Sequence, residues 1–330
     1  QWSSSAASDV YKRQECEPVQ LAAGTKGIGQ KLAIGAQLSM ELYPHHVFVV
    51  LDWRNAYNTI RRARVIKVLN STTATRVWLR AYNSHTAPMS PIYYRSKNGL
   101  VKTDYASVTG GQQGDLMGGD GYCLATLEDN RWLDAELAKH GGSFRAGMDD
   151  GLLHGPAEAV WPLVAQYTAR MKRSCDLEVT VRKCKCFSPS GRYGARPAGF
   201  PIGEIKRRVQ GPDGVEREEV AGQGVVLWGS PVGDSGFVKQ VLAEKSDEIR
   251  SLIEINKTAL VSRDPDAFLQ VLRQSLCHRW DYWQQTQPPR LTHTHTHSHS
   301  TQLHTRTHTH THTLALSRSA RAQTGALSRS

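Results

Sequence analysis

The sequence contains no apolar stretch that approaches the length of a membrane span, no recognisable signal peptide and few cysteines. A transmembrane helix needs about 20 consecutive apolar residues. Six cysteines occur among 330 residues, and no two of them form a Cys-x-x-Cys pair. We therefore expect a soluble, intracellular protein that has no membrane partner and whose cysteines are free thiols.

For the pair Cys184 and Cys186, a shared metal site is the alternative to two free thiols. Alternate residues of a strand point to opposite faces, so one ion could not easily bind both thiolates. No histidine at a zinc-site spacing accompanies the pair.

Acidic residues are outnumbered by basic ones. The chain has 41 Lys and Arg against 30 Asp and Glu, a net charge of +11. Such a balance favours a polyanionic partner, although four arginines of the C-terminal tail contribute to it. They are Arg306, Arg318, Arg321 and Arg329.

Neither end of the chain has the apolar periodicity of a folded element. Residues 1–16 begin without an initiator Met, and we expect an extraneous or disordered end. Residues 290–330 repeat Thr-His, at 292–297 and 307–312. A His-rich tract could bind metal. The strict alternation is also what a repeated AC dinucleotide encodes, and we expect a disordered low-complexity tail.

Residues 47–51, Val-Phe-Val-Val-Leu, form a short apolar run that predicts a buried strand. Asp52 follows at the point where the chain leaves the sheet, which is a suitable position for a metal ligand. The alternative is that Asp52 caps the next helix.

Asp149 and Asp150 lie between two short apolar runs, which predicts a strand-turn-strand unit. Adjacent carboxylates oppose each other's ionisation, and a divalent cation reverses that effect. With Asp52 on a neighbouring strand, they could hold two magnesium ions for phosphoryl transfer. An ordinary polar turn is the alternative.

A glycine-rich loop at residues 110–118 separates these acidic motifs and leads into a long helical stretch at 116–140. Free backbone amides at such a helix start suit contacts with a phosphate or a nucleobase.

Three motifs occur in order: Asp52-x-x-Asn-Ala-Tyr57, Gln113-Gly114-Asp115 and Met148-Asp149-Asp150. Their order and separation resemble the palm of reverse transcriptases, in particular those of non-LTR, LINE-like retroelements. The resemblance implies an α/β (α+β) fold with a polymerase right-hand palm, an antiparallel sheet backed by helices, partial fingers and a helical thumb.

Other segments are similar to parts of the same family. Residues 18–27, with Lys26, resemble the segment before the first palm strand, and residues 177–186 resemble the motif that carries a lysine, here Lys183. Residues 225–233 resemble the primer grip, with Leu227, Trp228 and Gly229 at its core. The likeness implies fingers and palm over 17–234, with the fingers truncated at the N-terminal side, and a thumb over 235–289.

The implied activity is RNA-directed DNA synthesis, in which a DNA primer 3′-hydroxyl attacks the α-phosphate of a dNTP on an RNA template. Asp52 and Asp149 would bind two Mg²⁺ ions, or Mn²⁺, with Asp150 supporting them. Lys183 would assist the departing pyrophosphate.

The nucleotide-binding residues implied by the resemblance are Tyr57, Gln113, Gly114 and Lys26. Gln113 and Gly114 would pack against the nascent base pair. An aromatic ring at Tyr57 would crowd the sugar 2′-carbon and exclude ribonucleotides. The alternative is a tyrosine that serves only the core.

The sequence departs from the family at three points. Gly147 replaces an aromatic residue, which would loosen its strand; Leu116-Met117 replaces Pro-Leu; and the fingers are short. A catalytically inactive remnant that binds nucleic acid non-specifically is therefore the alternative function. An RNA polymerase palm is a third possibility.

Local patterns predict further helices and hairpins. A helix at 55–69 carries Arg61, Arg62 and Arg64, for which a nucleic-acid contact and a solvated face are equally open. Asn98-Gly99 predicts a tight hairpin turn. The remaining predictions are helices at 29–42, 77–82, 156–172 and 236–255, a polar loop or hairpin at 207–221, and a helix that begins at 264–265.

Overall fold

The computed structural model describes residues 14–22, 26–86, 90–97, 99–111, 117–276, 278, 282 and 285–287. The chain forms two compact units, Gln1–Leu252 and Ile253–Ser330. The predicted nucleotide-binding residues Gln113 and Gly114, and the predictions for the first residues and for the Thr-His tail, lie outside the described residues.

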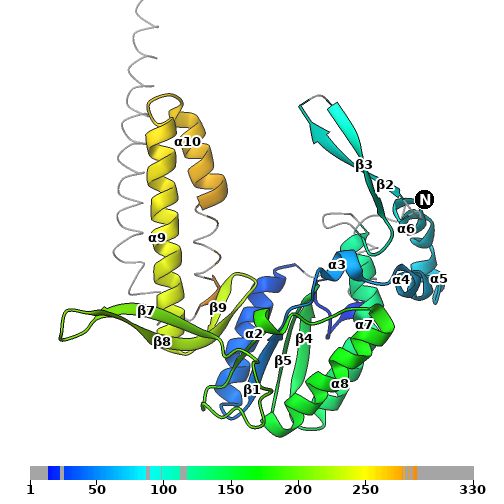
Figure 1. The fold of residues 1–330 in the computed structure, drawn as a ribbon, viewed down its shortest axis with the longest axis horizontal. Helices are drawn as coiled ribbons and strands as arrows, with labels where there is room; N and C mark the ends of the chain where they lie inside the picture. The colour runs from blue at the N-terminus through cyan, green and yellow to red at the C-terminus, as the bar shows by residue number, and fades with distance from the viewer. Residues whose placement is uncertain are drawn as a thin grey trace, which may run out of the picture. The chain divides into compact units, whose positions relative to one another are not determined.

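A four-stranded antiparallel sheet forms the centre of the first unit (Figure 1). Its strands stand in the order β4-β5-β1-β6. Their bounds are Val47–Leu51 for β1, Ser143–Gly147 for β4, Asp150–Gly155 for β5 and Lys185–Phe187 for β6. The register pairs Val47 with Gly155 and Leu51 with Gly151, so the end of β1 lies beside the start of β5.

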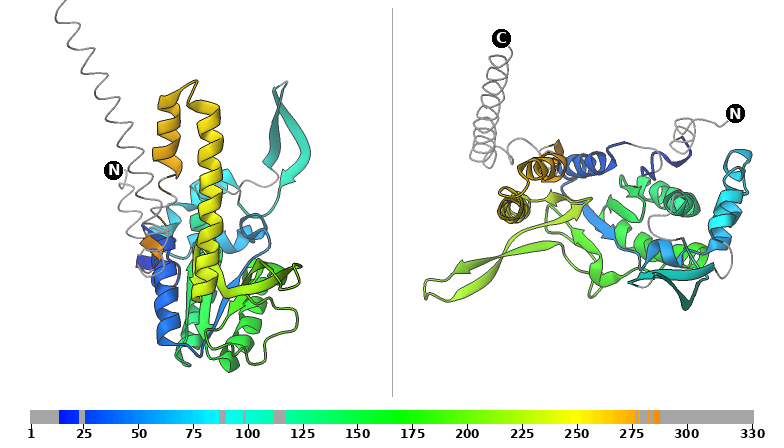
Figure 2. Two further views of the ribbon diagram at one scale, coloured as in Figure 1. Left: turned by 90° about the vertical axis from the view of Figure 1, so that its left-hand side faces the viewer. Right: turned by 90° about the horizontal axis from the view of Figure 1, so that it is seen from above.

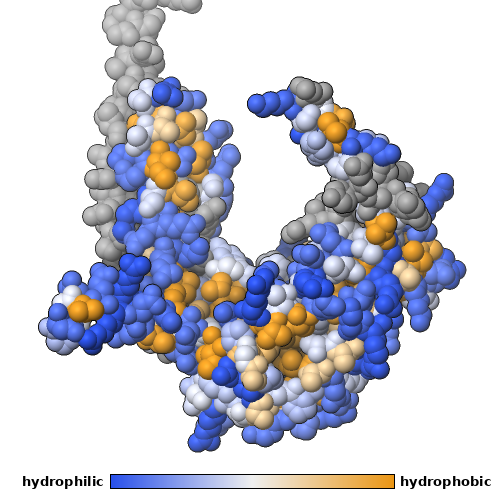
Figure 3. Space-filling model, viewed as in Figure 1, coloured by the Kyte–Doolittle hydropathy of each residue, from blue (hydrophilic) through white to orange (hydrophobic). Residues whose placement is uncertain are grey.

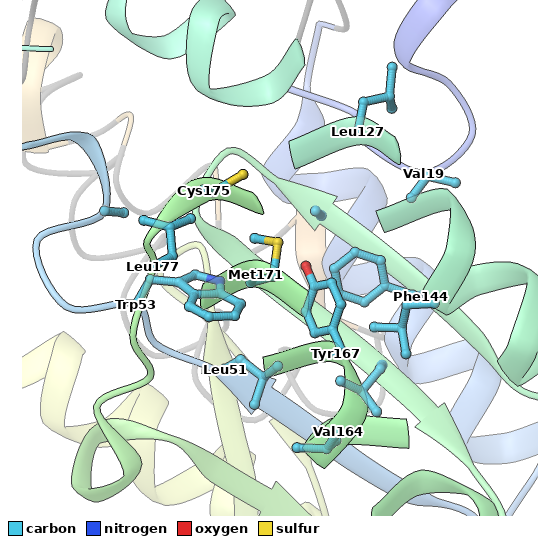
Figure 4. Close-up of a cluster of buried hydrophobic side chains, with 14 of the residues drawn as sticks. Val19, Leu51, Trp53, Leu127, Phe144, Val164, Tyr167, Met171, Cys175 and Leu177 are labelled. Carbon is cyan, nitrogen blue, oxygen red and sulfur yellow. The ribbon is translucent and has the colours of Figure 1, made fainter. Parts of the chain in front are cut away.

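Alternation along β1 sends its side chains into two cores. Val47, Val49 and Leu51 belong to the cluster that helices α7 (Gly118–Ala138) and α8 (Ala157–Cys175) complete. Figure 4 shows Leu51 there beside Tyr167 and Met171 of α8. The apolar run of β1 packs on both faces of the sheet, because both faces are covered by other elements.

The opposite face of the sheet is covered by helix α2 (Ile28–Leu42) and by strands β8 (Glu216–Leu227) and β9 (Ser230–Gly233) (Figure 2). Phe48 of β1 points to this side. It joins a second core with Ala33, Ala36, Met40, Leu152, Phe187, Val225, Leu227 and Val232.

The helix expected at residues 55–69 is interrupted, which corrects the prediction. It divides into α3 (Ala56–Thr59) and α4 (Arg62–Leu69), because Ile60 and Arg61 have extended backbones. The Arg61 amide donates to the Cys175 carbonyl, and the Ile60 carbonyl accepts from Gly110. Tertiary hydrogen bonds of these two residues therefore take the place of helical ones. Helices α5 (Thr73–Arg76) and α6 (Leu79–His85) follow.

Two hairpins match their predictions. Strands β2 (Ser90–Ser96) and β3 (Gly99–Ser107) pair around the expected turn, of which Asn98 lies outside the described residues. Strand β7 (Glu204–Gln210) pairs with β8 over the polar segment predicted as a loop or hairpin.

The remaining elements include η1 (Val181–Lys183) and the long helix α9 (Ser235–Leu260). On α9, Phe237, Val241 and Ile249 are buried as expected, whereas Leu252 is only half-buried. The second unit contains α10 (Pro265–Val271) and η2 (Leu272–Leu276). Asp264 caps α10 by accepting from the Ala267 amide, as the Asp-Pro pair predicts.

The predicted fold class, α/β with an antiparallel sheet backed by helices, is confirmed. The five described cysteines are buried free thiols, also as predicted: Cys16, Cys123, Cys175, Cys184 and Cys186. Within the described ranges, no helix has both the length and the apolar character of a membrane span.

Candidate active site

Asp52 lies one residue beyond β1, next to the start of β5, because Leu51 pairs with Gly151. Its backbone is fixed by two hydrogen bonds: the Asp52 amide donates to Cys184 Sγ at 3.3 Å, and the Thr180 amide donates to the Asp52 carbonyl at 2.8 Å. Asn55, rather than Asp52, occupies the N-cap of α3. The helix-cap alternative for Asp52 is therefore wrong.

The Asp52 carboxylate is unusual in its surroundings. Among the described residues, its Oδ1 atom is buried without a hydrogen-bond partner. The Lys183 ammonium lies 3.8 Å from the same oxygen. Buried carboxylate oxygens are normally hydrogen-bonded. This oxygen is thus available to a cation.

Met148 and Asp149 form the turn between β4 and β5, and Gly147 pairs with Asp150 across it. Met148 has a positive φ of 59°. The strand-turn-strand unit predicted from the Asp pair is therefore present, with Asp149 in the turn and Asp150 at the first position of β5.

Gln20, whose side chain is fully buried, holds this turn. Its Nε2 donates to the Met148 carbonyl at 2.9 Å, and its Oε1 accepts from the Met148 amide at 2.8 Å. The backbone beside it bonds to β4, because Ala146 donates to the Val19 carbonyl and Leu21 donates to that of Ala146. Sequence reasoning missed this role, since Gln20 lies 128 positions from Met148.

Tyr57 links α3 to the turn. Its hydroxyl donates to Asp149 Oδ1 at 3.2 Å, and its half-buried ring packs on that of Tyr122 with centroids 5.2 Å apart. Burial, followed by the charge of Asp149, raises the pKa of the Tyr57 phenol well above its usual value. The hydroxyl therefore stays protonated and donates, so Tyr57 does more than fill the core.

The charges of Asp149 and Asp52 both act on the carboxyl group of Asp150. Partial burial, then Asp149, then Asp52, raise the pKa of Asp150 from 3.8 to about 6. Repulsion of this kind marks a place where negative charge accumulates, and a bound cation would relieve it.

The part of the chain that the structure describes contains no group of three or more His, Cys, Asp or Glu side chains gathered as a metal cluster. Magnesium does not need one, because it commonly binds one or two carboxylates and completes its shell with water and substrate phosphates. The Asp52 carboxylate, whose Oδ1 has no hydrogen-bond partner, and the turn carboxylate of Asp149 fit that mode of binding.

Gly147 is packed, contrary to the expectation that it loosens its strand. It is buried, and a Cβ atom there would lie 2.3 Å from Cζ2 of Trp228. The Trp228 indole fills the space beside the backbone that a larger residue at 147 would need. Leu227, also predicted in the primer grip, is buried in the second core, and Gly229 is the exposed residue of the β8–β9 turn.

The start of the glycine-rich loop lies directly against α3. The Gly110 amide donates to the Ile60 carbonyl, and the Gly111 amide donates to that of Tyr57 at 2.8 Å. Gly110 has a φ of 61°, and a Cβ there would lie 2.2 Å from the Tyr57 carbonyl oxygen. Only glycine allows this approach.

The basic residues on α4 are held by the protein itself. Arg62 donates to the carbonyls of Gly110 at 2.8 Å and Ser107 at 2.9 Å, and Arg64 pairs with Glu128 at 2.8 Å. These two arginines are half-buried and bonded within the protein, so they do not form a solvated face; a nucleic-acid contact stays a prediction. Lys26, by contrast, is exposed just before α2.

No protein-family model matches the sequence, and no curated protein sequence matches it. Among solved structures, the chain is similar to apo telomerase from Candida tropicalis, with 9% identity and a TM-score of 0.41 over 69% of this chain and 39% of that one. A form of that telomerase without its C-terminal domain gives 8% identity and a TM-score of 0.40, over 54% and 39% of the two chains.

Telomerase from Candida albicans, in complex with the TWJ fragment of telomeric RNA, gives 10% identity and a TM-score of 0.42, over 87% of this chain and 52% of that one. The chain thus spans between 39% and 52% of the length of these telomerase chains. At such identity and superposition, the likeness carries no argument about activity.

Proposed function

We propose that this chain is the reverse transcriptase domain of a non-LTR retroelement, which extends a DNA primer with dNTPs on an RNA template. The observation that supports it best is the arrangement at one end of β1 and β5. There the end of β1 lies beside the start of β5, the charges of Asp149 and Asp52 raise the pKa of Asp150, and the Tyr57 hydroxyl donates to Asp149. The motif resemblance supplies the reaction.

Asp52 and Asp149 would hold the Mg²⁺ or Mn²⁺ ions. When bound, two such ions lower the pKa of an attacking hydroxyl and neutralise charge on the leaving pyrophosphate. Asp52 offers its buried, unbonded Oδ1. Asp150, whose pKa is raised to about 6, adds negative charge beside them at neutral pH.

Lys183 would act on the leaving group. Its ammonium is exposed and lies 3.8 Å from Asp52 Oδ1, at the edge of the carboxylate cluster. A triphosphate held by ions at Asp52 would come within reach of this long side chain. The ammonium could then place positive charge, or a proton, on the departing pyrophosphate.

Tyr57 would select the sugar. Its hydroxyl is anchored by Asp149 and its ring by Tyr122, so the ring is fixed beside the carboxylates. A fixed aromatic ring rejects an added 2′-hydroxyl by steric exclusion, which favours DNA synthesis over RNA synthesis.

Primer extension tests the proposal. The full chain is incubated with an RNA template, a labelled DNA primer, dNTPs and Mg²⁺, and Asp149→Asn is compared with Asp213→Asn, which changes an exposed carboxylate in the β7–β8 connection. We expect extension by the wild type and by Asp213→Asn, and its loss in Asp149→Asn. If the wild type binds RNA and extends nothing, the chain is an inactive remnant.

A further inference from the structure

The β2–β3 hairpin exposes aromatic and basic side chains together. Tyr93 and Tyr94 are each 54% exposed, and Leu100 is 75% exposed. Arg95, Lys97 and Lys102 are exposed as well. Figure 1 shows the hairpin extending away from the four-stranded sheet, and Figure 3 shows apolar residues exposed among hydrophilic ones on it. A two-stranded hairpin of this kind is marginal alone.

The register divides these side chains between two faces. Tyr93 pairs with Lys102, Arg95 with Leu100, and Tyr94 with Val101. Residues directly opposite each other share a face, and neighbours along a strand alternate. Tyr93, Arg95 and Lys102 therefore lie on one face, which we call the basic hairpin face, and Tyr94 lies on the other.

The base of the hairpin is tied to the candidate active site. The Arg62 guanidinium bonds to the Ser107 carbonyl and hydroxyl, at the end of β3. Two residues further on, the Thr109 hydroxyl donates to the Asn58 carbonyl at 3.0 Å, and Gly111 donates to that of Tyr57. Because α3 carries Tyr57, the hairpin emerges beside the residues that face the carboxylates.

We propose that the basic hairpin face binds single-stranded template RNA, with one base stacked on Tyr93 and the phosphates on either side near Arg95 and Lys102. An exposed aromatic ring between cations is the arrangement that proteins use to hold single strands. Residues 90–107 contain three basic residues and one acidic residue, Asp104, so the hairpin has a positive excess that suits a polyanion.

The choice of a template strand rests on the proposed function. Stacking on Tyr93 requires an unpaired base, and a primer terminus is paired with its template. The unpaired strand at such a site is the template ahead of the terminus, which for a reverse transcriptase is RNA. An uncharged apolar protein surface would leave the three cations of the hairpin without counter-charges.

Two tyrosines with equal exposure on opposite faces supply a matched pair of variants. Binding of a fluorescent single-stranded RNA to the full chain is measured by anisotropy without dNTPs, for Tyr93→Ala and Tyr94→Ala. We expect Tyr93→Ala to raise the Kd by about 5- to 150-fold, the effect of one lost stacked base. Tyr94→Ala should change it by less than about 2-fold, since an exposed residue outside the contact has little effect.

The salt dependence gives a second readout that loss of folding would not imitate. For a single strand, each phosphate contact contributes about 0.7 to the slope of log K against log salt concentration. Arg95→Ala and Lys102→Ala should each reduce the slope by about that amount. Equal effects of Tyr93→Ala and Tyr94→Ala, or an equal loss of duplex RNA binding and single-stranded RNA binding in Tyr93→Ala, would overturn the proposal.

The outcome is separable from that of the proposed function. Asp213→Asn, in the β7–β8 connection, should bind the RNA as the wild type does, and the assay involves no chemistry. If Tyr93→Ala loses RNA binding and the wild type extends no primer, the hairpin proposal stands and the proposed polymerase activity is wrong. If the wild type extends the primer and Tyr93→Ala binds RNA as the wild type does, the polymerase activity stands and the hairpin proposal is wrong. That result would point to a protein partner on the basic hairpin face.

Discussion

Two hydrogen bonds from a single side chain, Gln20, fix the turn that presents Asp149. The Gln20 side-chain amide is buried, so its donor and its acceptor bond to the Met148 backbone rather than to water. Catalytic groups need such support, because a shift of about 1 Å in a reacting group can cost a large part of the rate. Gln20 is therefore a positioning residue for the carboxylate in the turn.

Replacing Gln20 with Leu should lower the free energy of unfolding by about 1–3 kcal/mol, because the Met148 amide and carbonyl lose their partners. Primer extension should fall further than the loss of folded protein explains. Urea unfolding and extension rates measured together check this. Gln210→Leu, at an exposed position at the end of β7, is the control and should change neither. If fully folded Gln20→Leu extends the primer at the wild-type rate, the positioning role of Gln20 is contradicted.

Two substitutions at Tyr57 distinguish the role of its ring from the role of its hydroxyl. Tyr57→Ala should increase the use of ribonucleotides relative to deoxyribonucleotides by about 10- to 100-fold, because the excluding ring is removed. Tyr57→Phe keeps the ring and loses the hydrogen bond to Asp149, so it should preserve sugar preference and reduce the rate. Competition between rNTP and dNTP in single-nucleotide extension measures both. An unchanged preference in Tyr57→Ala would favour an RNA polymerase palm.

At the scale of elements, β5 joins two different environments. Its first residue, Asp150, lies at the carboxylate cluster, whereas His154 near its other end is buried among aromatic rings. His154 stacks on Phe48 with centroids 5.1 Å apart, and its ring nitrogens lie 3.0 Å from His46 Nδ1 and 2.9 Å from Ser143 Oγ. Burial, followed by the charge of His46, lowers the pKa of His154 to about 4.

This shift predicts a dependence of stability on pH. The folded-state pKa lies below the unfolded value of 6.5, so the stability associated with neutral His154 is present above pH 6.5 and is lost as the pH falls towards 4. The loss should reach roughly 3 kcal/mol. Urea unfolding between pH 7 and 4 should show a flatter profile for His154→Phe than for the wild type. His140→Phe, at an exposed position, should keep the wild-type slope. An equal slope in all three proteins would contradict this assignment.

Local sequence patterns predicted those parts of the molecule that depend on neighbours along the chain. The apolar run before Asp52 and the acidic pair between two apolar segments gave β1 and the β4–β5 turn correctly. Antiparallel pairing then brings Asp52 and Asp150 to one end of the sheet. The Asp-Pro start of α10 followed from capping chemistry alone.

Features that depend on distant residues escaped prediction. The break at Ile60 and Arg61 is made by hydrogen bonds to Gly110 and Cys175, which no helical period reveals. The arginine run looked available to solvent or nucleic acid, whereas Arg62 is used to anchor the end of β3. Gly147 looked like a weak point because nothing in its own segment indicates that Trp228 packs against it.

For the molecule as a whole, the proposed polymerase activity requires Asp52 and Asp149 to serve one set of metal ions, although almost a hundred positions separate them in the sequence. Two carboxylates that share an ion lose its binding together when either one is neutralised, because magnesium and manganese depend on few protein ligands in such sites.

The most direct measurement is Mn²⁺ binding by electron paramagnetic resonance, in the presence of primer, RNA template and a dNTP. We predict that the wild type and Asp213→Asn bind Mn²⁺ with equal affinity, and that Asp52→Asn and Asp149→Asn each lose that binding while remaining folded. Removal of the metal with EDTA should abolish extension in the proteins that bind it. If Asp52→Asn retains the Mn²⁺ affinity of the wild type, the two carboxylates do not form one site and the central claim is contradicted.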